Sequence, residues 1–318
     1  MMEMEETVSF FQNPYGWCIL WFSLMAAGLT MLSGRKKNVP LSVTGLYAIL
    51  AGVLGLFLGR LVYCAVRFEF MFYDEIGNFA GLSAFFDVQN GSVNVGGILL
   101  GFLLAAPITK GITGQRAASL LDAAALPGLF LYSALRFVEP LSGQGYGEWM
   151  ENEALWFSPL CIQNDWGEWM LSVCFIEGVL TLILLIVLLC LVKKMKAPGT
   201  LTLYTLCLFS ALQVLPECLR CDDVLFVLIF ARVTHIALAC TLFFTQFAAL
   251  LRGKKRGLAT KTLALESGLM LIGIVLCIGT IFALDKTNIP DIYVYLVMVV
   301  SLCLMVFLTC RRIRKEDQ

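Results

Sequence analysis

Several charged and amide residues lie within or at the ends of long apolar runs of the sequence. Arg136 and Glu139 are three residues apart, so they can pair on one face of a helix. Gln213, Glu217 and Arg220 also share one helical face by their spacing. Because a charge at bilayer depth costs at least about 2.5–3.5 kcal/mol, such residues are candidates for function. A guanidinium matches the geometry of a phosphate, so the set predicts a lipid-phosphate site at headgroup depth; the alternative is an ion-pair network that joins helices.

The apolar runs that must position these residues are long enough to cross a membrane. Of 318 residues, 59% are hydrophobic and 14% are charged, and the mean hydropathy is +0.83. Soluble domains average about 45–50% apolar and about 25% charged residues. The sequence therefore predicts an all-α, polytopic helical membrane protein with about nine transmembrane helices. The expected spans are 16–33, 43–66, 94–109, 119–138, 169–192, 200–219, 225–251, 262–284 and 292–310.

The distribution of basic residues predicts how these spans are oriented. Lys+Arg and Asp+Glu both number 23, and this balance excludes a dominant basic surface for nucleic acid. Most of the basic residues fall at 35–37, 110–116, 193–196, 252–261 and 311–315. Only Arg67, Arg220 and Lys286 fall in the connections on the opposite side. The positive-inside rule therefore predicts an N-terminus outside the cytoplasm and a C-terminus inside it.

The cysteine and histidine content makes a metal site improbable. Cys218 and Cys221 have CxxC spacing at an outer helix end, which suits a redox pair or half of a metal site. No second CxxC exists, and the one histidine, His235, lies in another span. We therefore expect ordinary helix-end cysteines, no metal and no cofactor. Asp122 and Glu266 lie near inner helix ends, where we expect interfacial anchors.

One stretch carries a family resemblance. The segment Arg136-Phe-Val-Glu-Pro-Leu-Ser-Gly-Gln-Gly-Tyr-Gly147 resembles the R-x-G-N-x-x-N-G-E-x-[WY]-G signature of bacterial prolipoprotein diacylglyceryl transferases. Its Arg136, Gly143, Tyr146 and Gly147 match without a gap. The resemblance covers about residues 15–225. Further similar positions are Arg60 with Tyr63, Asp122, the Glu177-Gly178 pair, and Glu217 with Arg220.

The resemblance implies a function, a location and partners. The family transfers the diacylglyceryl group of phosphatidylglycerol to the lipobox cysteine thiol of prolipoproteins, in the bacterial cytoplasmic (inner) membrane and without a cofactor. It implies a seven-helix transferase-like domain at 16–251, between an extracytoplasmic N-terminus at 1–15 and two additional helices at 262–310. A basic cytoplasmic tail follows at 311–318. The expected partners are phosphatidylglycerol, the prolipoprotein signal peptide and the lipid bilayer.

The chain departs from the family pattern at polar positions. A family histidine maps to Asn94 or Val95, a family arginine to Gln213 and a family asparagine to Glu139. We therefore expect catalysis to involve Arg136, Glu139 and Asn94. The residues expected to bind phosphatidylglycerol are Arg136, Arg60, Tyr63, Gly147, Gln213, Glu217 and Arg220. Two alternatives stay open at this point: a non-catalytic relative that binds lipid or prolipoprotein, and a membrane transporter.

Overall fold

A computed structural model describes residues 14–73, 79, 81–86, 93–164, 166–222, 225–227, 231–255, 260–286 and 290–317. Most of the extracytoplasmic N-terminus expected at 1–15 lies outside these ranges. Among the described residues, nine helices are long and apolar enough to cross a membrane, which confirms the predicted architecture. They are α1 (Pro14–Lys36), α2 (Leu41–Val66), α4 (Val95–Thr113), α5 (Ala117–Val138), α6 (Val173–Leu191), α7 (Thr200–Leu219), α8 (Val233–Lys255), α9 (Thr260–Lys286) and α10 (Asp291–Asp317).

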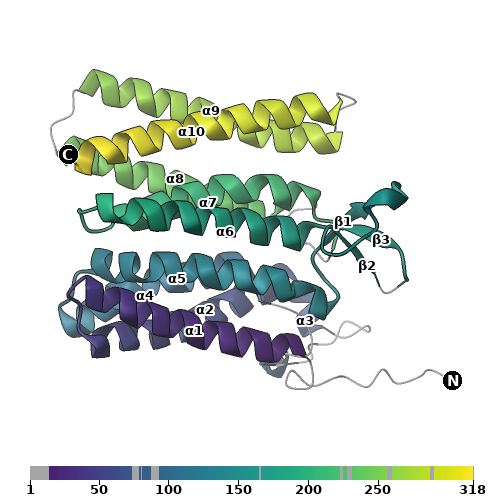
Figure 1. Ribbon diagram of the computed structural model, residues 1–318, viewed down its shortest axis with the longest axis horizontal. Coiled ribbons are helices and arrows are strands. Elements are labelled where there is room, and N and C mark those ends of the chain that lie inside the picture. The colour runs from purple at the N-terminus through teal and green to yellow at the C-terminus, as the bar shows by residue number, and fades with distance from the viewer. Residues whose placement is uncertain are drawn as a thin grey trace. The chain divides into compact units, whose positions relative to one another are not determined.

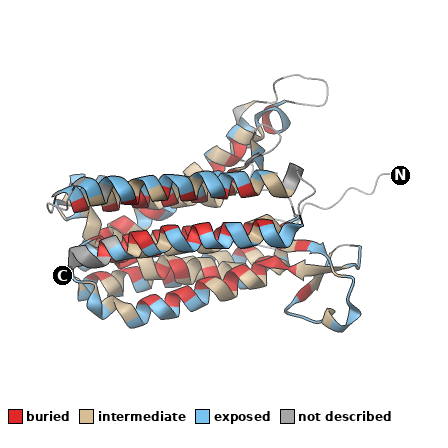
Figure 2. Ribbon diagram, turned by 90° about the horizontal axis from the view of Figure 1, so that it is seen from above, coloured by how far each residue is buried: buried red, intermediate tan, exposed pale blue. Residues whose placement is uncertain are grey.

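The side chains on these helices suit a lipid environment. Large apolar residues such as Trp21, Leu56 and Phe244 are more than half exposed, and Figure 2 shows exposed residues along several of the long helices. Water would make such surfaces costly, whereas lipid chains are as apolar as the side chains themselves. The exposed faces are therefore lipid-facing surfaces of a membrane protein.

The chain divides into two compact units. Unit 1 comprises Met1–Leu182 and Arg220–Thr234, and unit 2 comprises Ile183–Leu219 and His235–Gln318. Helix α6 contributes its first part to unit 1 and its remainder to unit 2. The predicted division into a family domain and two added helices stays a prediction.

Unit 1 is built on a bundle of α1, α2, α4 and α5, which run side by side in Figure 1. Glycines bring α2 and α4 into direct backbone contact. A Cβ added to Gly97 would lie 2.6 Å from the Cα of Gly59, and one added to Gly101 would lie 2.5 Å from the Cα of Gly55. Both helices therefore carry a G-x-x-x-G pattern at the crossing, where any side chain would force the helices apart.

Short elements connect the long helices of unit 1. After α2 come α3 (Phe68–Phe72) and η1 (Leu82–Phe85), and after α5 comes η2 (Glu139–Ser142). The connection between α5 and α6 also contains η3 (Glu153–Leu155) and an antiparallel sheet in the order β1-β3-β2. Its strands are β1 (Tyr146–Trp149), β2 (Cys161–Gln163) and β3 (Trp169–Ser172), and β4 (Phe226–Val227) pairs with β5 (Ala231–Arg232) further along.

These strands correct two predicted helix boundaries. The span expected at 169–192 begins as a helix only at Val173, because the backbone of residues 169–172 pairs with both β1 and β2. The span expected at 225–251 begins as a helix at Val233, because residues 226–227 and 231–232 form a two-stranded ribbon. Both segments are apolar enough to extend a hydrophobic run, and hydropathy alone does not distinguish a strand from a helix.

Unit 2 contains α7, α8, α9 and α10, with η4 (Val192–Lys194) between α6 and α7. Helices α9 and α10 pack against each other along the unit (Figure 1). The Tyr204 hydroxyl of α7 donates a hydrogen bond to the backbone carbonyl of Cys310 in α10, at 3.1 Å. Leu203, Ala249 and Ile313 form a small core among α7, α8 and α10. The two C-terminal helices are thus packed parts of this unit.

Candidate functional site

The end of α5 places Arg136 beside two carboxylates. Arg136 lies in the last turn of α5, and the chain continues directly into η2, which begins with Glu139. Arg136 Nη1 donates to Glu139 Oε2 at 2.5 Å, and Arg136 Nε lies 2.7 Å from Glu177 Oε2 on α6. The guanidinium also lies over the ring of Tyr132, one turn back, with 4.8 Å to the ring centre. Arg136 is therefore held by three neighbours in one orientation.

Arg220, directly after α7, joins the same group. Its Nη2 donates to Glu139 Oε1 at 2.7 Å, and its Nη1 donates to Glu177 Oε2 at 3.3 Å. Its Nε donates to Asp222 Oδ1 at 3.0 Å, and its Nη2 also pairs with Asp222 Oδ2. All three guanidinium nitrogens of Arg220 are thus engaged by carboxylates. We call Arg136, Glu139, Glu177, Arg220 and Asp222 the ion-pair cluster.

Gly145 ties the loop after η2 to this cluster. Its backbone N–H donates to Asp222 Oδ2 at 2.8 Å. Its φ is +93°, a conformation that L residues with a side chain rarely adopt. A Cβ at this position would lie 2.6 Å from the Cβ of Cys174 and 3.3 Å from the Cγ of Glu139. The glycine-rich loop at 143–147 therefore packs directly on the cluster, and Gly147 lies buried in β1.

The cluster is nearly closed to solvent and has more acids than bases. Its side chains are between 1% and 12% exposed, with Arg136 the most accessible at 12%. Two guanidiniums face three carboxylates within the cluster, and a third guanidinium, that of Arg232, lies beside it and donates to the backbone carbonyl of Arg220 at 3.1 Å. Burial and the neighbouring Arg136 lower the pKa of Arg220, but Glu139, Asp222 and Glu177 outweigh them, and its pKa lies above the ordinary value. Arg220 therefore keeps its charge at every physiological pH.

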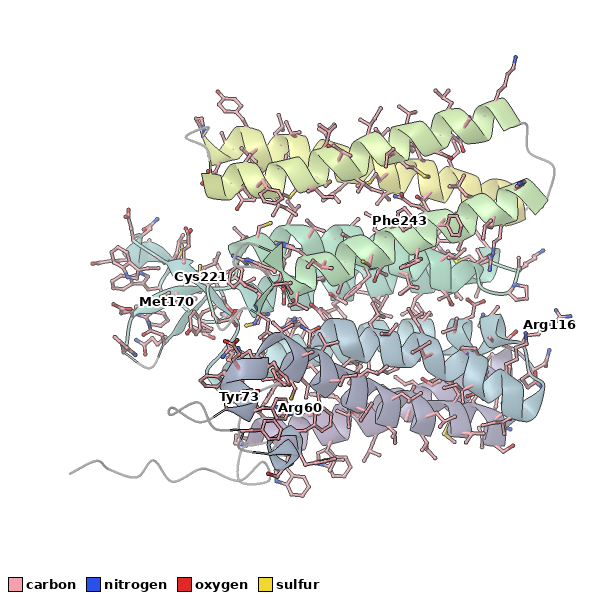
Figure 3. All side chains as sticks on the ribbon, turned by 180° about the vertical axis from the view of Figure 1, so that it is seen from behind. Arg60, Tyr73, Arg116, Met170, Cys221 and Phe243 are labelled. Carbon is pink, nitrogen blue, oxygen red and sulfur yellow. The ribbon has the colours of Figure 1, made fainter. Side chains whose placement is uncertain are left out.

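Arg60 and Tyr63 form a second group, at the end of α2. The Arg60 guanidinium lies over the Tyr63 ring at 5.5 Å, and its Nε donates to the backbone carbonyl of Phe85 at 3.0 Å. Arg67 lies over the same ring at 5.8 Å. Figure 3 labels Arg60 at the same end of the unit 1 helices as Tyr73, and Arg116 at the other end. The basic residue Arg67 was not among the predicted ligands, although its spacing from Tyr63 places both on one helical face.

The Asn94 side chain caps the N-terminus of α4. Its side-chain carbonyl accepts hydrogen bonds from the N–H groups of Gly96 at 2.8 Å and Gly97 at 3.4 Å, so it caps the N-terminus of α4. Its own N–H donates to the carbonyl of Gly59 on α2 at 3.1 Å. Asn94, one of the two residues to which the family histidine maps, therefore fixes the start of α4 against α2.

Gln213 and Glu217 lie on α7, in unit 2. Both are buried, with 2% and 4% of their surface exposed, and both interact with other groups.

The two cysteines of the CxxC pair lie at and just after the end of the same helix. The Cys218 sulfur lies 3.5 Å from Nε2 of His235. Cys218 and Cys221 carry thiols rather than a disulfide. Burial and the charge of Glu148 raise the pKa of the Cys221 thiol.

The remaining sequence-derived expectations concern anchors and metals. Asp122 is 3% exposed and lies 3.7 Å from the ammonium of Lys37, at the basic end of the unit 1 helices. The described residues contain no group of three or more side chains that could hold a metal ion.

Two of the five members of the ion-pair cluster, Glu177 and Asp222, were not among the site residues predicted from the sequence. Glu177 could have been selected from the sequence as a charged residue within an apolar run. Asp222 was marked only by its position two residues after Arg220.

One family of known proteins is similar to most of the chain. The family model described as prolipoprotein diacylglyceryl transferase matches residues 9–252. This region contains the whole ion-pair cluster, Arg60, Tyr63 and Asn94, and it ends near the end of α8. None of the curated proteins compared with the chain matches it.

Proposed function

The chain belongs to the prolipoprotein diacylglyceryl transferase family, and we propose that it transfers a diacylglyceryl group from a glycerophospholipid to the lipobox cysteine thiol of a prolipoprotein. Phosphatidylglycerol is the donor that family membership implies and the first one to test. The proposed location is the bacterial cytoplasmic membrane, with the cluster on the outer side. The observation that carries the proposal is the convergence of Arg136 and Arg220, from separate helices, with the glycine-rich loop.

The reaction makes two chemical demands on such a site. The cysteine must lose its proton, because the thiolate is the nucleophile and a free thiol has a pKa of about 8.5. The sulfur then bonds to the glyceryl carbon that carries the phosphate ester, and the bond from this carbon to the ester oxygen breaks. The electron pair leaves with the glycerol phosphate, which needs positive charge beside it. Arg136, the most accessible member of the cluster, is the proposed phosphate ligand.

Glu139 is the proposed acceptor of the thiol proton. Its two oxygens are each paired with one arginine, an arrangement that stabilises the charged carboxylate. If the donor phosphate draws Arg136 towards itself, Glu139 loses one of these partners and accepts a proton more readily. Asn94 cannot take up this task, because an amide does not bind a proton at neutral pH. We assign Asn94 a positioning role, through the start of α4.

Arg60 and Tyr63, together with Gln213 and Glu217, are proposed as further contacts for the donor lipid. Arg60 and Tyr63 offer a cation and a phenol hydroxyl near the end of α2. Gln213 and Glu217 offer an amide and a carboxylate on α7. Gly147 is proposed to allow close approach of lipid to the β1 backbone.

A non-catalytic lipid-binding or prolipoprotein-binding role is the second candidate function. One specific observation favours it: both arginines of the cluster are already paired with carboxylates. A protein of this kind would hold the lipid or the signal peptide without breaking the ester bond.

Transfer of labelled lipid to a peptide separates the two candidates. The purified protein is reconstituted with phosphatidylglycerol that carries a labelled acyl chain, and a synthetic lipobox peptide is the acceptor. We expect labelled thioether product from the wild type and a loss of about 100-fold or more in Arg136→Gln. Arg116→Gln, at the other end of the unit 1 helices, is the matched control. Binding of peptide and lipid without any product would support the non-catalytic function, and full activity in Arg136→Gln would exclude the proposed role of Arg136.

A further inference from the structure

The sheet of β1, β2 and β3 has one face that packs on a neighbouring segment and one open face. On the first face, Trp156 stacks on Trp169 of β3, with 6.4 Å between the ring centres. Met170, the next residue of β3, points to the second face, where it lies opposite Trp149 of β1 and Ile162 of β2. Trp149 is 55% exposed, and Met170 and Ile162 are partly exposed. We call Trp149, Ile162 and Met170 the open face of the sheet.

The open face begins at the ion-pair cluster. Ser172 lies two residues after Met170 on β3, so both side chains lie on one face of the sheet. The Ser172 hydroxyl is 3.4 Å from the sulfur of Cys174, whose N–H donates to the carbonyl of Gly145 at 2.9 Å. The N–H of Gly145 in turn donates to a carboxylate of the cluster at 2.8 Å. Figure 3 labels Met170 at the end of unit 1 opposite Arg116. The cluster and the open face are therefore joined by direct contacts.

The charges around the open face are negative. Residues 137–192 contain no Lys, Arg or His. Glu168, two residues before Met170, is exposed and is held by Asn164, which donates to its Oε2 at 2.9 Å and accepts its backbone N–H at 3.0 Å. Three more glutamates near the sheet are exposed, namely Glu148, Glu151 and Glu153. A basic side chain could lie along an exposed Trp ring and place its charge beside a glutamate, whereas an acidic one would be repelled.

We infer that the open face binds the stretch of the acceptor polypeptide that follows the acceptor cysteine, and that it favours basic side chains about four to six residues after this cysteine. The inference rests on the proposed function, in which the cysteine reaches the cluster and the rest of the prolipoprotein continues away from the membrane. Strand residues rise about 3.3 Å each, so the path from Ser172 to Glu168 is about 13 Å. An extended acceptor covers this path, and the step to it from the cluster, in about four to six residues.

Binding of lipobox peptides that differ only in charge tests the inference without catalysis. Three fluorescent peptides carry serine in place of the acceptor cysteine, so no thioether can form. Their extensions have two lysines, two glutamines or two glutamates at the fourth and sixth positions after the serine. Fluorescence anisotropy with the intact protein in detergent gives the three affinities. We expect the basic peptide to bind about fivefold more tightly than the neutral one and the acidic peptide to bind least tightly. Higher salt should reduce these differences.

Variants of the open face and its rim should change the preference in different ways. Glu168→Gln should weaken binding of the basic peptide and leave the neutral one unchanged, and Glu168→Lys should make the acidic peptide bind more tightly than the basic one. Trp149→Leu removes the aromatic ring and should also lower the preference for the basic peptide, whereas Trp149→Phe should keep part of it. Glu69→Gln, at an exposed glutamate of α3, is the matched control and should keep the wild-type order.

The outcomes separate this inference from the proposed function. Equal affinities of the wild type for all three peptides, or an order that is unchanged in Glu168→Lys, overturn the inference. The corresponding cysteine peptides, incubated with the wild type and labelled phosphatidylglycerol, test the proposed function by formation of thioether product. Product without a charge preference in binding leaves the proposed function in place and overturns the inference. A charge preference without product contradicts catalysis and supports binding of the acceptor at the open face.

Discussion

Removing a base from the ion-pair cluster and removing an acid should have unequal effects on stability. Arg220→Gln leaves three carboxylates around the single guanidinium of Arg136, all of them nearly or fully buried. Asp222→Asn keeps both guanidiniums of the cluster, and each of them keeps a carboxylate partner in Glu139 and Glu177. Loss of one partner from a buried ion pair typically costs about 3–5 kcal/mol. We expect a cost of that size for Arg220→Gln and of about 1 kcal/mol for Asp222→Asn, because the asparagine can still accept the N–H of Gly145.

Thermal unfolding in detergent measures this difference. One kcal/mol shifts the midpoint of a domain of 150–250 residues by about 2–4 °C. Arg220→Gln should therefore lower the midpoint by at least about 6 °C, and Asp222→Asn by only about 2–4 °C. All variants must be heated at one scan rate, because membrane proteins often unfold irreversibly. Arg220→Lys, which keeps the charge but loses the planar fork, should fall between the two.

Charged residues at exposed positions outside the cluster provide the controls for this measurement. Glu153→Gln and Arg116→Gln change charge at exposed positions and should leave the midpoint within about 1 °C of the wild type, since exposed single charges contribute little. An equal or larger loss of stability in Asp222→Asn than in Arg220→Gln would refute the reasoning. It would mean that the Asp222 contacts to Arg220 and Gly145 outweigh the charge balance of the whole cluster.

Three further predictions follow from contacts outside the charge balance. Gly101→Ala should destabilise the protein by about 1–3 kcal/mol, because its Cβ would lie 2.5 Å from Gly55, whereas Gly111→Ala on the same helix meets open space and should be neutral in thermal unfolding. Asn94→Ala should cost about 1 kcal/mol by removing the cap of α4, and Asn94→Asp should restore most of it; a stable Asn94→Ala would contradict the capping role. Cys221 is exposed and its thiol pKa is raised, so the thiolate fraction is small at neutral pH and grows as the pH rises; its maleimide labelling should reach half-maximum above the pH of about 8.5 typical of a free cysteine. A midpoint below that value would show that the charges of Glu148 and the partial burial do not act on this thiol.

The membrane architecture could be predicted from the sequence because it depends on composition over long windows. Nine runs of sufficient length and hydropathy are found as nine helices in the described part of the chain. The strands at 169–172, 226–227 and 231–232 could not be predicted in this way. Their pairing depends on partners elsewhere in the chain, such as Tyr146 opposite Ser172, and hydropathy contains no information about such partners.

The candidate site could be predicted only in part, because some of its contacts join residues that are far apart in the sequence. Arg136 and Glu139 are three residues apart, so local spacing was sufficient to pair them. Arg220 meets Glu139 across 81 residues of sequence, and Gly145 meets Asp222 across 77. The family resemblance placed Arg220 in the site, but Asp222 lies outside the motifs, and only the folded chain shows that it completes the cluster. Asn94 was selected as a catalytic position by alignment, and the structure adds its capping role.

The order in which the cluster's members occur along the chain has a consequence for biogenesis. A nascent chain delivers α5 to the bilayer before α6 and α7 have been synthesised, so Arg136 enters without Glu177 or Arg220. Glu139, one turn further on, can neutralise it at once because their pairing is local. Glu177 then adds a negative charge, Arg220 cancels it, and Asp222 follows two residues later. At every step of insertion the partly assembled cluster therefore has at most one uncompensated charge, which keeps the cost of moving each helix into lipid low.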